Sequence, residues 1–412
     1  MTRREWLAGA TAAFAASAVS SNAVAASVQP KRVAAIVTRY EKLLHADVIV
    51  GKILEGWKQD GGKGPALKVV SMYVDQFGPK DLARKLSKEH GFPIFDTIEE
   101  TITVGGNGIP VDGVISVGEH GKYPYNEKGQ HLYPRRRFFK EITDTFEKFD
   151  HVVPVFNDKH LGPQWKDAKW MYDRAKQLKI PFMASSSLPT TFRKPDLKLP
   201  MRCEIETAVG VGYSGLDIYG FHTLDCYQCI VERRKGAESG VKSVQCLQGE
   251  SAWKAVEDGI VDKKTLQAAI KVTPGASGTN PFSDNKASLF LFRYNDGFQG
   301  AVVMFSQFLH GISTAVKLKG DSEAKATYFE ERLKPAVPHF AYLLKACERM
   351  IHTRRPTYPV ERTLLSGGIL DAALTSIHEG NKLIATPELG ISYTPVDYPH
   401  APHVDLDASP TS

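Results

Sequence analysis

Short hydrophobic runs and amphipathic stretches alternate along the first half of the chain. Four amphipathic stretches have the i, i+3, i+4 spacing of apolar residues that predicts a helix. The predicted strands are 32–37, 67–74, 92–95, 111–117, 152–156 and 180–184, and the predicted helices are 46–57, 81–90, 138–149 and 165–178. Repeated alternation of this kind predicts an α/β fold with a Rossmann-like, doubly wound parallel sheet.

The pattern changes in the second half of the chain. Residues 241–247 alternate as a half-exposed strand, and two apolar runs within 287–304 meet at the hairpin turn signal Asn-Asp-Gly. Helices are predicted at 333–350 and 363–379. We therefore expect an α+β domain with an open, mainly antiparallel sheet. The predicted organisation is an export signal at 1–26, a nucleotide-binding-type domain at 30–187, a substrate or oligomerisation domain at 188–393 and an extended tail at 394–412.

One glycine motif needs its structural context. Gly210-Val-Gly-Tyr-Ser-Gly215 matches G-x-G-x-x-G, but a dinucleotide fingerprint must leave a strand and open a helix. We predict a helix at 203–209 and a strand at 216–219, which makes the motif a helix-to-strand turn.

The N-terminus has the composition of an export signal. Arg3 and Arg4 precede an alanine-rich run that ends at Ala23-Val-Ala25, a small-x-small cleavage pattern. This resembles a twin-arginine signal peptide. The apolar run is too short and too weakly apolar for a transmembrane anchor, so we expect an exported, periplasmic or extracytoplasmic protein without a stable membrane anchor.

Composition narrows the classes of function. The 412 residues are 42% hydrophobic and 24% charged with a net charge of +6, which excludes wholesale disorder and gives no basic face for nucleic acid. The basic runs 135–137 and 233–235 are therefore predicted to be solvated helix faces. The five cysteines leave at least one thiol unpaired, and Cys226 and Cys229 in a helical apolar stretch are expected to be structural. No metal site is predicted.

Polar residues follow the ends of the predicted strands. In doubly wound sheets ligands bind at the carboxyl ends of the strands, so these residues are the candidates for a binding site. The cofactor-binding candidates are Thr38, Arg39, Tyr40, Asp75, Gly118, Glu119, His120, Asn157 and Lys159.

Several segments, in order, resemble the glucose–fructose oxidoreductase / inositol dehydrogenase / MocA family of NAD(P)-dependent sugar enzymes. They include 81–96, 111–118, 165–185 and the hairpin at 287–304. Asp158-Lys159-His160 stands where the family has Glu-Lys-Pro, with Lys159 on the family lysine. Leu216 to Asp225 is similar to its Leu-Asp-x-Gly-x-His-x-x-Asp segment with one extra residue.

The resemblance implies roles for individual residues. Lys159 would anchor a substrate hydroxyl and His222 would relay its proton while hydride passes to the nicotinamide, with Asp217 on the same segment. Asp75 would bind the ribose hydroxyls and so favour NAD over NADP. A strand-end lysine facing water and a satisfied histidine in the sheet are the structural alternatives for the first two residues.

The sequence departs from the family at the phosphate-binding loop. Its three fingerprint glycines fall on Val37, Arg39 and Lys42, whose side chains would occupy the space of the pyrophosphate. Either NAD or NADP lies differently or no cofactor binds. An insertion rich in tyrosine and charge, at 122–137, follows the fourth strand, and it would form a lid, a sugar-stacking wall or a cover for the sheet edge.

Three hypotheses for function remain open. The first is an exported oxidoreductase that acts on a sugar or polyol by hydride transfer to NAD(P). The second is a lyase or glycosidase on the same scaffold, and the third is a carbohydrate-binding protein that has lost the cofactor. The expected partner is a small sugar or polyol, and the family resemblance implies a homo-oligomer.

Overall fold

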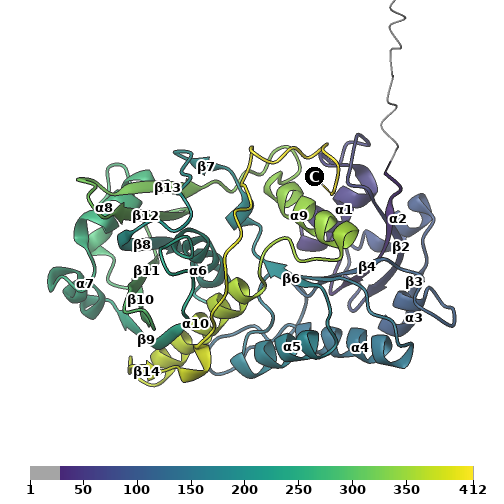
Figure 1. Cartoon of the computed structure of the whole chain (residues 1–412), viewed down its shortest axis with the longest axis horizontal. Helices are drawn as coiled ribbons and strands as arrows, with labels where there is room; N and C mark the ends of the chain where they lie inside the picture. The colour runs from purple at the N-terminus through teal and green to yellow at the C-terminus, as the bar shows by residue number, and fades with distance from the viewer. Residues whose placement is uncertain (1–27, 412) are drawn as a thin grey trace, which may run out of the picture.

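The computed structural model describes residues 28–411, so the predicted export signal lies outside the described residues. Two β-sheets stand side by side, each covered by helices on both faces (Figure 1). Within residues 28–411, no helix combines the length and the apolar character needed to cross a membrane.

The first sheet has six strands in the order β3-β2-β1-β4-β5-β6, with parallel pairing throughout. The strands are β1 (Lys31–Val37), β2 (Leu67–Val74), β3 (Ile94–Phe95), β4 (Gly113–Val117), β5 (Val155–Asp158) and β6 (Phe182–Ser185). This is the strand order of a Rossmann fold, with the topological switch between β1 and β4. The prediction of a doubly wound parallel sheet is confirmed.

Helices cover both faces of the first sheet. Their bounds are α1 (His45–Glu55), α2 (Ala83–His90), α3 (Ile98–Thr103), α4 (Arg135–Lys148) and α5 (Trp165–Gln177). The helices α1 and α2 pack on one face, and α3, α4 and α5 pack on the other. Helix α9 (His339–Thr353) comes from much later in the chain, yet it completes the face covered by α1 (Figure 1).

The second sheet has eight strands in the order β14-β9-β10-β11-β8-β12-β13-β7. The strands are β7 (Arg193–Lys194), β8 (Ile205–Tyr213), β9 (Val241–Gln248), β10 (Ser288–Tyr294), β11 (Gln299–Phe305), β12 (Ile312–Leu318), β13 (Lys325–Phe329) and β14 (Ile384–Ala385). Only the β11–β8 pair is parallel among these described strands. The mainly antiparallel sheet and the hairpin at 287–304 are confirmed.

Four helices cover the second sheet. They are α6 (Ile218–Val231) and α10 (Glu361–His378) on one face, and α7 (Glu250–Glu257) and α8 (Lys263–Val272) on the other. Short 3-10 turns, η1 (Leu188–Thr190), η2 (Pro281–Ser283) and η3 (Pro387–Leu389), complete the secondary structure. Cys226 and Cys229 are buried free thiols in α6, as predicted for structural cysteines.

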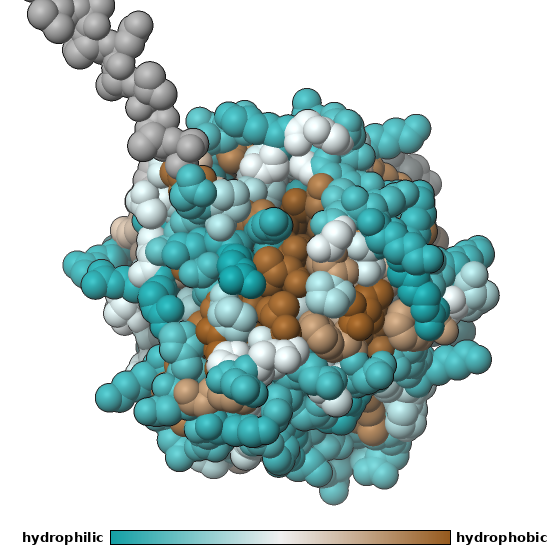
Figure 2. All heavy atoms as spheres, turned by 90° about the vertical axis from the view of Figure 1, so that its right-hand side faces the viewer, coloured by the Kyte–Doolittle hydropathy of each residue, from teal (hydrophilic) through white to brown (hydrophobic). Residues whose placement is uncertain are grey.

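The outer side of the first domain is polar at its rim. Figure 2 shows this side, where hydrophilic side chains surround a smaller hydrophobic area near the centre.

The prediction that the basic runs 135–137 and 233–235 are solvated is wrong for three of their six residues. Arg135, Arg233 and Arg234 are buried, while Arg136, Arg137 and Lys235 keep exposed side chains. Each buried guanidinium has a carboxylate partner: Glu119 for Arg135, Asp397 for Arg233 and Glu238 for Arg234. A run of like charges does not reveal such partners, because they lie outside the run, between four and more than a hundred residues away.

The secondary structure around Gly210 and Gly212 also differs from the prediction. Residues 205–213 form strand β8 and α6 follows, so the predicted helix at 203–209 and strand at 216–219 are wrong. Both glycines lie within the strand beneath α6, where Thr223 and Tyr227 press against them. The glycines of this motif let α6 pack closely on β8. The motif does not belong to a βαβ unit of the first sheet.

This packing gives a test of the fold. A Cβ at Gly212 would collide with Thr223 Oγ1 and lie 2.7 Å from Met304 Sδ, both buried. We expect Gly212→Ala to lower the free energy of unfolding by about 1–3 kcal/mol through overpacking, measured by urea denaturation. The matched control is Gly215→Ala, whose Cβ would meet open space and which we expect to change stability by less than about 0.5 kcal/mol. Equal effects of the two substitutions would contradict this account of the motif.

Candidate functional site

The candidate site is a cavity of about 820 Å³ between the two sheet domains. It opens at the carboxyl ends of β4 and β5, where a doubly wound sheet binds its ligands. The polar residues that line it are Lys42, His45, Gln59, Glu119, His120, Lys159, Ser187, Tyr219, His222, Glu331, Lys334 and His339. Apolar side chains, among them Leu188, Ile218 and Phe340, complete the wall, as in a pocket for a small organic molecule.

A buried group of charges forms the floor of the cavity. Glu119 follows β4, and one of its carboxylate oxygens lies 2.9 Å from Lys159 Nζ while the other contacts the guanidinium of Arg135. All three side chains are at most 5% exposed. Burial opposes ionisation of Glu119, but the charges of Lys159 and Arg135 hold its pKa well below its usual value. The carboxylate is therefore charged, and Lys159 is held at the end of β5.

The backbone is strained at the same two strand ends. His120 and Lys159 have φ angles of 69° and 65°, in the left-handed region that costs a non-glycine residue roughly 1–2 kcal/mol. Neighbouring strands hold these conformations: the amide of Lys159 donates to Ser185 O at 3.0 Å, and Thr38 Oγ1 donates to Glu119 O. Strain of this kind is concentrated at functional sites because the surrounding fold must maintain it.

The second domain brings His222 to the cavity. This histidine lies on α6, and its Nδ1 is 2.6 Å from the hydroxyl of Ser186, so Nε2 is the ring nitrogen left for a ligand. Ser186 is held in turn by the carboxylate of Asp225, which accepts its backbone N–H at 2.9 Å. Burial and the nearby charge of Lys159 lower the pKa of His222 well below its usual value. The imidazole is therefore neutral.

Three more histidines surround the cavity. His45 Nδ1 lies 2.6 Å from Asp158 Oδ2, and its ring packs edge-on against His120 and Phe340. Burial, followed by the influence of His45, lowers the pKa of His120 to about 4 and that of His339 to about 3. The neutral imidazoles of His120 and His339 can both donate to and accept from hydroxyl groups, so they suit a polyhydroxylated ligand.

The structure brings four of the predicted site residues together: Lys159, His222, Glu119 and His120 all line the cavity. Asp217 does not line it, and its carboxylate accepts the backbone N–H of His131 at 2.9 Å, within the insertion. Asn157 also lies outside the lining, and its side-chain amide donates to the carbonyls of Asp158 and His160. These two residues shape loops near the site.

The predicted ribose ligand, Asp75, is occupied by side chains of this protein. Tyr73 and Tyr123 each donate to it at 2.6 Å, and the guanidinium of Arg137 also contacts it. Burial opposes ionisation, but these three groups together lower the pKa of Asp75. Tyr123 and Arg137 come from the insertion at 122–137, which therefore covers the carboxyl end of β2.

The loop between β1 and α1 is also filled. The side chain of Tyr40 is fully buried, and Arg39 pairs with Glu41 at 2.6 Å while lying against Gly78 of the next loop. At the start of α1, where a pyrophosphate would bind, the carboxylate of Asp47 already accepts the N–H of Leu43 at 2.9 Å.

Gly118 shows the same filling on the other side of the switch point. A Cβ there would lie 2.7 Å from Cγ of Arg135, so the space that this glycine leaves is taken by an arginine. Together with the loop after β1 and the occupied Asp75, this means that the residues present do not fit a nicotinamide dinucleotide in the pose that doubly wound sheets use.

Sequence reasoning missed several residues of the site. Arg135 was assigned to the surface, and no role was assigned to Ser186, Glu331, His45 or His339. Asp225 belongs to the segment that resembles the dehydrogenase family, and that segment was the one available signal for it. The others are brought together only by the tertiary structure.

No protein-family model matches this sequence, and no curated protein sequence matches it. Solved structures do match. Scyllo-inositol dehydrogenase from Lactobacillus casei with bound NAD(H) and scyllo-inositol is 11% identical, covers 87% of this chain and 99% of its own, and has a TM-score of 0.54. GenD2 from gentamicin A biosynthesis in complex with NAD is 9% identical, with coverages of 87% and 97% and a TM-score of 0.55.

A third match is a putative myo-inositol dehydrogenase from Sinorhizobium meliloti, 12% identical, with coverages of 86% and 99% and a TM-score of 0.51. Likeness at this identity concerns the fold, because one fold supports many reactions. The similarity spans both sheets rather than the nucleotide-binding-type domain alone. This chain has the two-domain fold of the glucose–fructose oxidoreductase / inositol dehydrogenase / MocA enzymes.

Proposed function

We propose that this protein is an enzyme that acts on a sugar or another polyol in the cavity between its domains. The observation that carries the proposal is that Lys159 and His222, from different domains, line one cavity beside a strained backbone and the neutral imidazoles of His120 and His339. A cation and a neutral imidazole facing one ligand are suited to proton transfer at a hydroxyl or at an adjacent carbon. The scyllo-inositol bound in the similar structure from Lactobacillus casei supports a polyol as the substrate class.

Lys159 would stabilise negative charge on the substrate. Its ammonium group is fixed by Glu119 at 2.9 Å, so the direction of its remaining N–H bonds is set before a ligand enters. An oxygen that gains charge in the transition state would accept one of these bonds, and preorganisation avoids the cost of turning the lysine during the reaction.

His222 would move the proton. Its ring is neutral, and Nδ1 is held by Ser186, so Nε2 is the atom that takes a proton from the ligand. Asp225 holds Ser186 from behind through the Ser186 amide and the Ser185 hydroxyl. We therefore regard Asp225 and Ser186 as positioning residues for the imidazole.

The filled dinucleotide groove favours a reaction without net oxidation, which is the lyase or glycosidase alternative of the sequence analysis. The second candidate is the oxidoreductase, with NAD or NADP as hydride acceptor. NAD in two of the similar structures favours it. The residues around Asp75 and Tyr40 block the usual pose of the nucleotide. An oxidoreductase would therefore have to bind NAD or NADP in a different pose.

Export and assembly belong to the same proposal. We propose that the twin-arginine-type segment directs the protein out of the cytoplasm, and its support is the sequence of residues 1–26 alone. A homo-oligomer remains a prediction from the family resemblance.

The two chemistries can be separated directly. We expect neither NAD nor NADH to bind in a calorimetric titration, because side chains of this protein fill the groove. The protein is then incubated in D2O with a sugar, a polyol or its keto form. We expect NMR to show either exchange of a substrate proton for deuterium or conversion of the substrate. When NAD is added to the same mixture, its absorbance should not change. Tight nucleotide binding with net hydride transfer would overturn the redox-neutral reaction and establish the second candidate.

Once a substrate is found, His222→Gln tests the assignment of the proton-transfer residue. We expect kcat to fall about 10²–10⁴-fold, because glutamine keeps a hydrogen-bonding group but cannot take a proton at this site. The control is His378→Gln, an exposed histidine at the end of α10, which should leave kcat unchanged. If both variants retain wild-type kcat, His222 is not the proton-transfer residue.

Asp225 gives a prediction for stability against pH. Burial raises its pKa to about 6, above the value of about 3.9 for an unfolded aspartate. The folded state therefore binds the proton of the Asp225 carboxyl more tightly than the unfolded state does. The resulting contribution to the free energy of unfolding, roughly 3 kcal/mol, is full below about pH 4 and is lost as the pH rises to about 6. In Asp225→Asn this loss is absent, so the stability of the variant relative to wild type should increase between pH 4 and pH 7, measured by urea denaturation. Parallel pH profiles would contradict the raised pKa.

A further inference from the structure

A second cluster of metal-ligating side chains lies away from the cavity. His400 and His403, in the C-terminal tail, point at Asp196 in the loop that follows β7. His400 Nε2 lies 2.6 Å from one carboxylate oxygen of Asp196, and His403 Nε2 lies 2.6 Å from the other. Among the described residues, this is the one group of three or more His, Cys, Asp or Glu side chains whose ligand atoms all fall within 4.8 Å of one another.

We propose that Asp196, His400 and His403 bind a zinc ion that fastens the C-terminal tail to the loop after β7. Two imidazole nitrogens and one carboxylate oxygen are ligands that suit Zn²⁺, and three protein ligands leave a fourth position for water. Hard cations such as Ca²⁺ and Mg²⁺ prefer sites made of oxygen, so the two histidines select against them.

The geometry requires a small adjustment. A tetrahedral zinc ion with bonds of about 2.0–2.1 Å separates its ligand atoms by roughly 3.3 Å, more than the 2.6 Å of the present hydrogen bonds. Asp196 and His403 can move apart because their side chains are 51% and 48% exposed, whereas His400 is 5% exposed and fixed. Each ring would shift its proton from Nε2 to Nδ1 and present the Nε2 lone pair to the ion.

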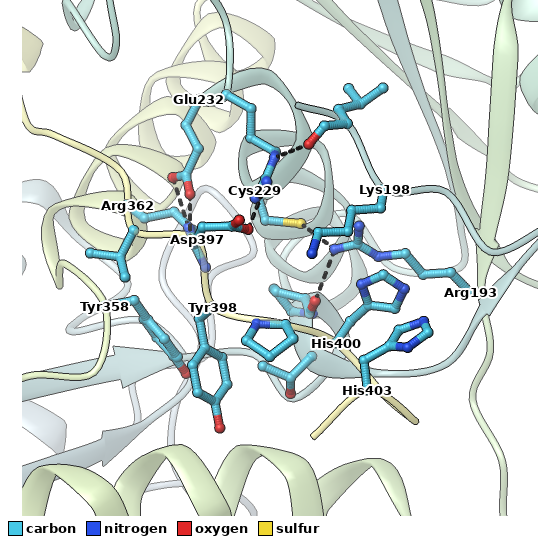
Figure 3. A pocket seen from close by; sticks show the side chains of 16 residues that line it. Arg193, Lys198, Cys229, Glu232, Tyr358, Arg362, Asp397, Tyr398, His400 and His403 are labelled. Carbon is cyan, nitrogen blue, oxygen red and sulfur yellow. Dashed lines mark hydrogen bonds and ion pairs between the residues drawn. The ribbon is translucent and has the colours of Figure 1, made fainter. Parts of the chain in front are cut away.

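The surroundings limit what can bind. Figure 3 shows His400 and His403 beside Arg193 and Lys198 at one end of a small hollow, and the two rings lie edge to face with centroids 5.1 Å apart. The hollow has a volume of only about 30 Å³, room for a few water molecules at most. The positive charge of Arg193 and Lys198 opposes the ion, so we expect the affinity to depend on all three ligands together.

The position explains what the ion would do. Between the ligands, the backbone N–H of Ala401 donates to Thr190 O at 3.0 Å, in the short turn η1 that follows the first sheet. Asp397 upstream pairs with Arg233 at 2.7 Å, at the border of the second domain. A zinc ion at this point would join two segments about two hundred residues apart in the sequence, which the alternating-strand pattern could not reveal.

The test uses the full mature chain, purified without a histidine tag, stripped with a chelator and dialysed against Zn²⁺. We expect one zinc ion per chain by elemental mass spectrometry, and a visible spectrum of tetrahedral cobalt when Co²⁺ is the probe. We also expect the zinc ion to raise Tm and to slow proteolysis of the tail, because it binds only the folded state.

Variants make the result specific. Asp196→Asn and His403→Gln change exposed side chains that the fold tolerates, and each should abolish stoichiometric binding and the rise in Tm. His90→Gln, an exposed histidine at the end of α2, is the matched control and should behave as wild type. Wild-type protein that binds no zinc, or variants that bind it as well as wild type, would overturn the proposal.

Discussion

Lys159 and Arg135 are two cations removed from water, and both depend on the single carboxylate of Glu119. Leaving a buried charge unpaired costs several kcal/mol, whereas a paired charge with good geometry is tolerated. Because the three groups come from the ends of β4 and β5 and the start of α4, their pairing fixes those elements relative to each other. The orientation of the lysine in the cavity and the close approach of α4 to Gly118 both follow from this contact.

The same contact explains how a familiar fold carries an altered site. Arg135 follows the insertion at 122–137, which occupies the carboxyl end of β2 through Tyr123 and Arg137. Side chains thus take the place that a cofactor has in doubly wound sheets, while the part of the cavity near Lys159 and His222 stays open. The scaffold is retained, and the ligand space is reduced to the region between the domains.

Much of the fold could be predicted from the sequence, because strands of the first sheet are buried runs and its helices have a clear apolar period. The strand at 205–213 could not be predicted, because Gly210 and Gly212 interrupt its apolar pattern. Both glycines make room for side chains of α6, which the local sequence does not show. Strand ends and family segments mark Lys159, His222, Glu119 and His120, and these four residues line one cavity. Arg135 was misplaced and Ser186 was missed, because local sequence does not show which distant residue pairs with a charge or a hydroxyl.

The path of the chain through α9 has a consequence for the order of synthesis. This helix supplies Phe340, Leu343 and Ile351 to the core of the first sheet, although β1 and α1 are made hundreds of residues earlier. Until residues 339–353 emerge from the ribosome, the face of the sheet that they cover stays exposed to water. The core of the first sheet can therefore be completed only late in synthesis, after α9 has been made.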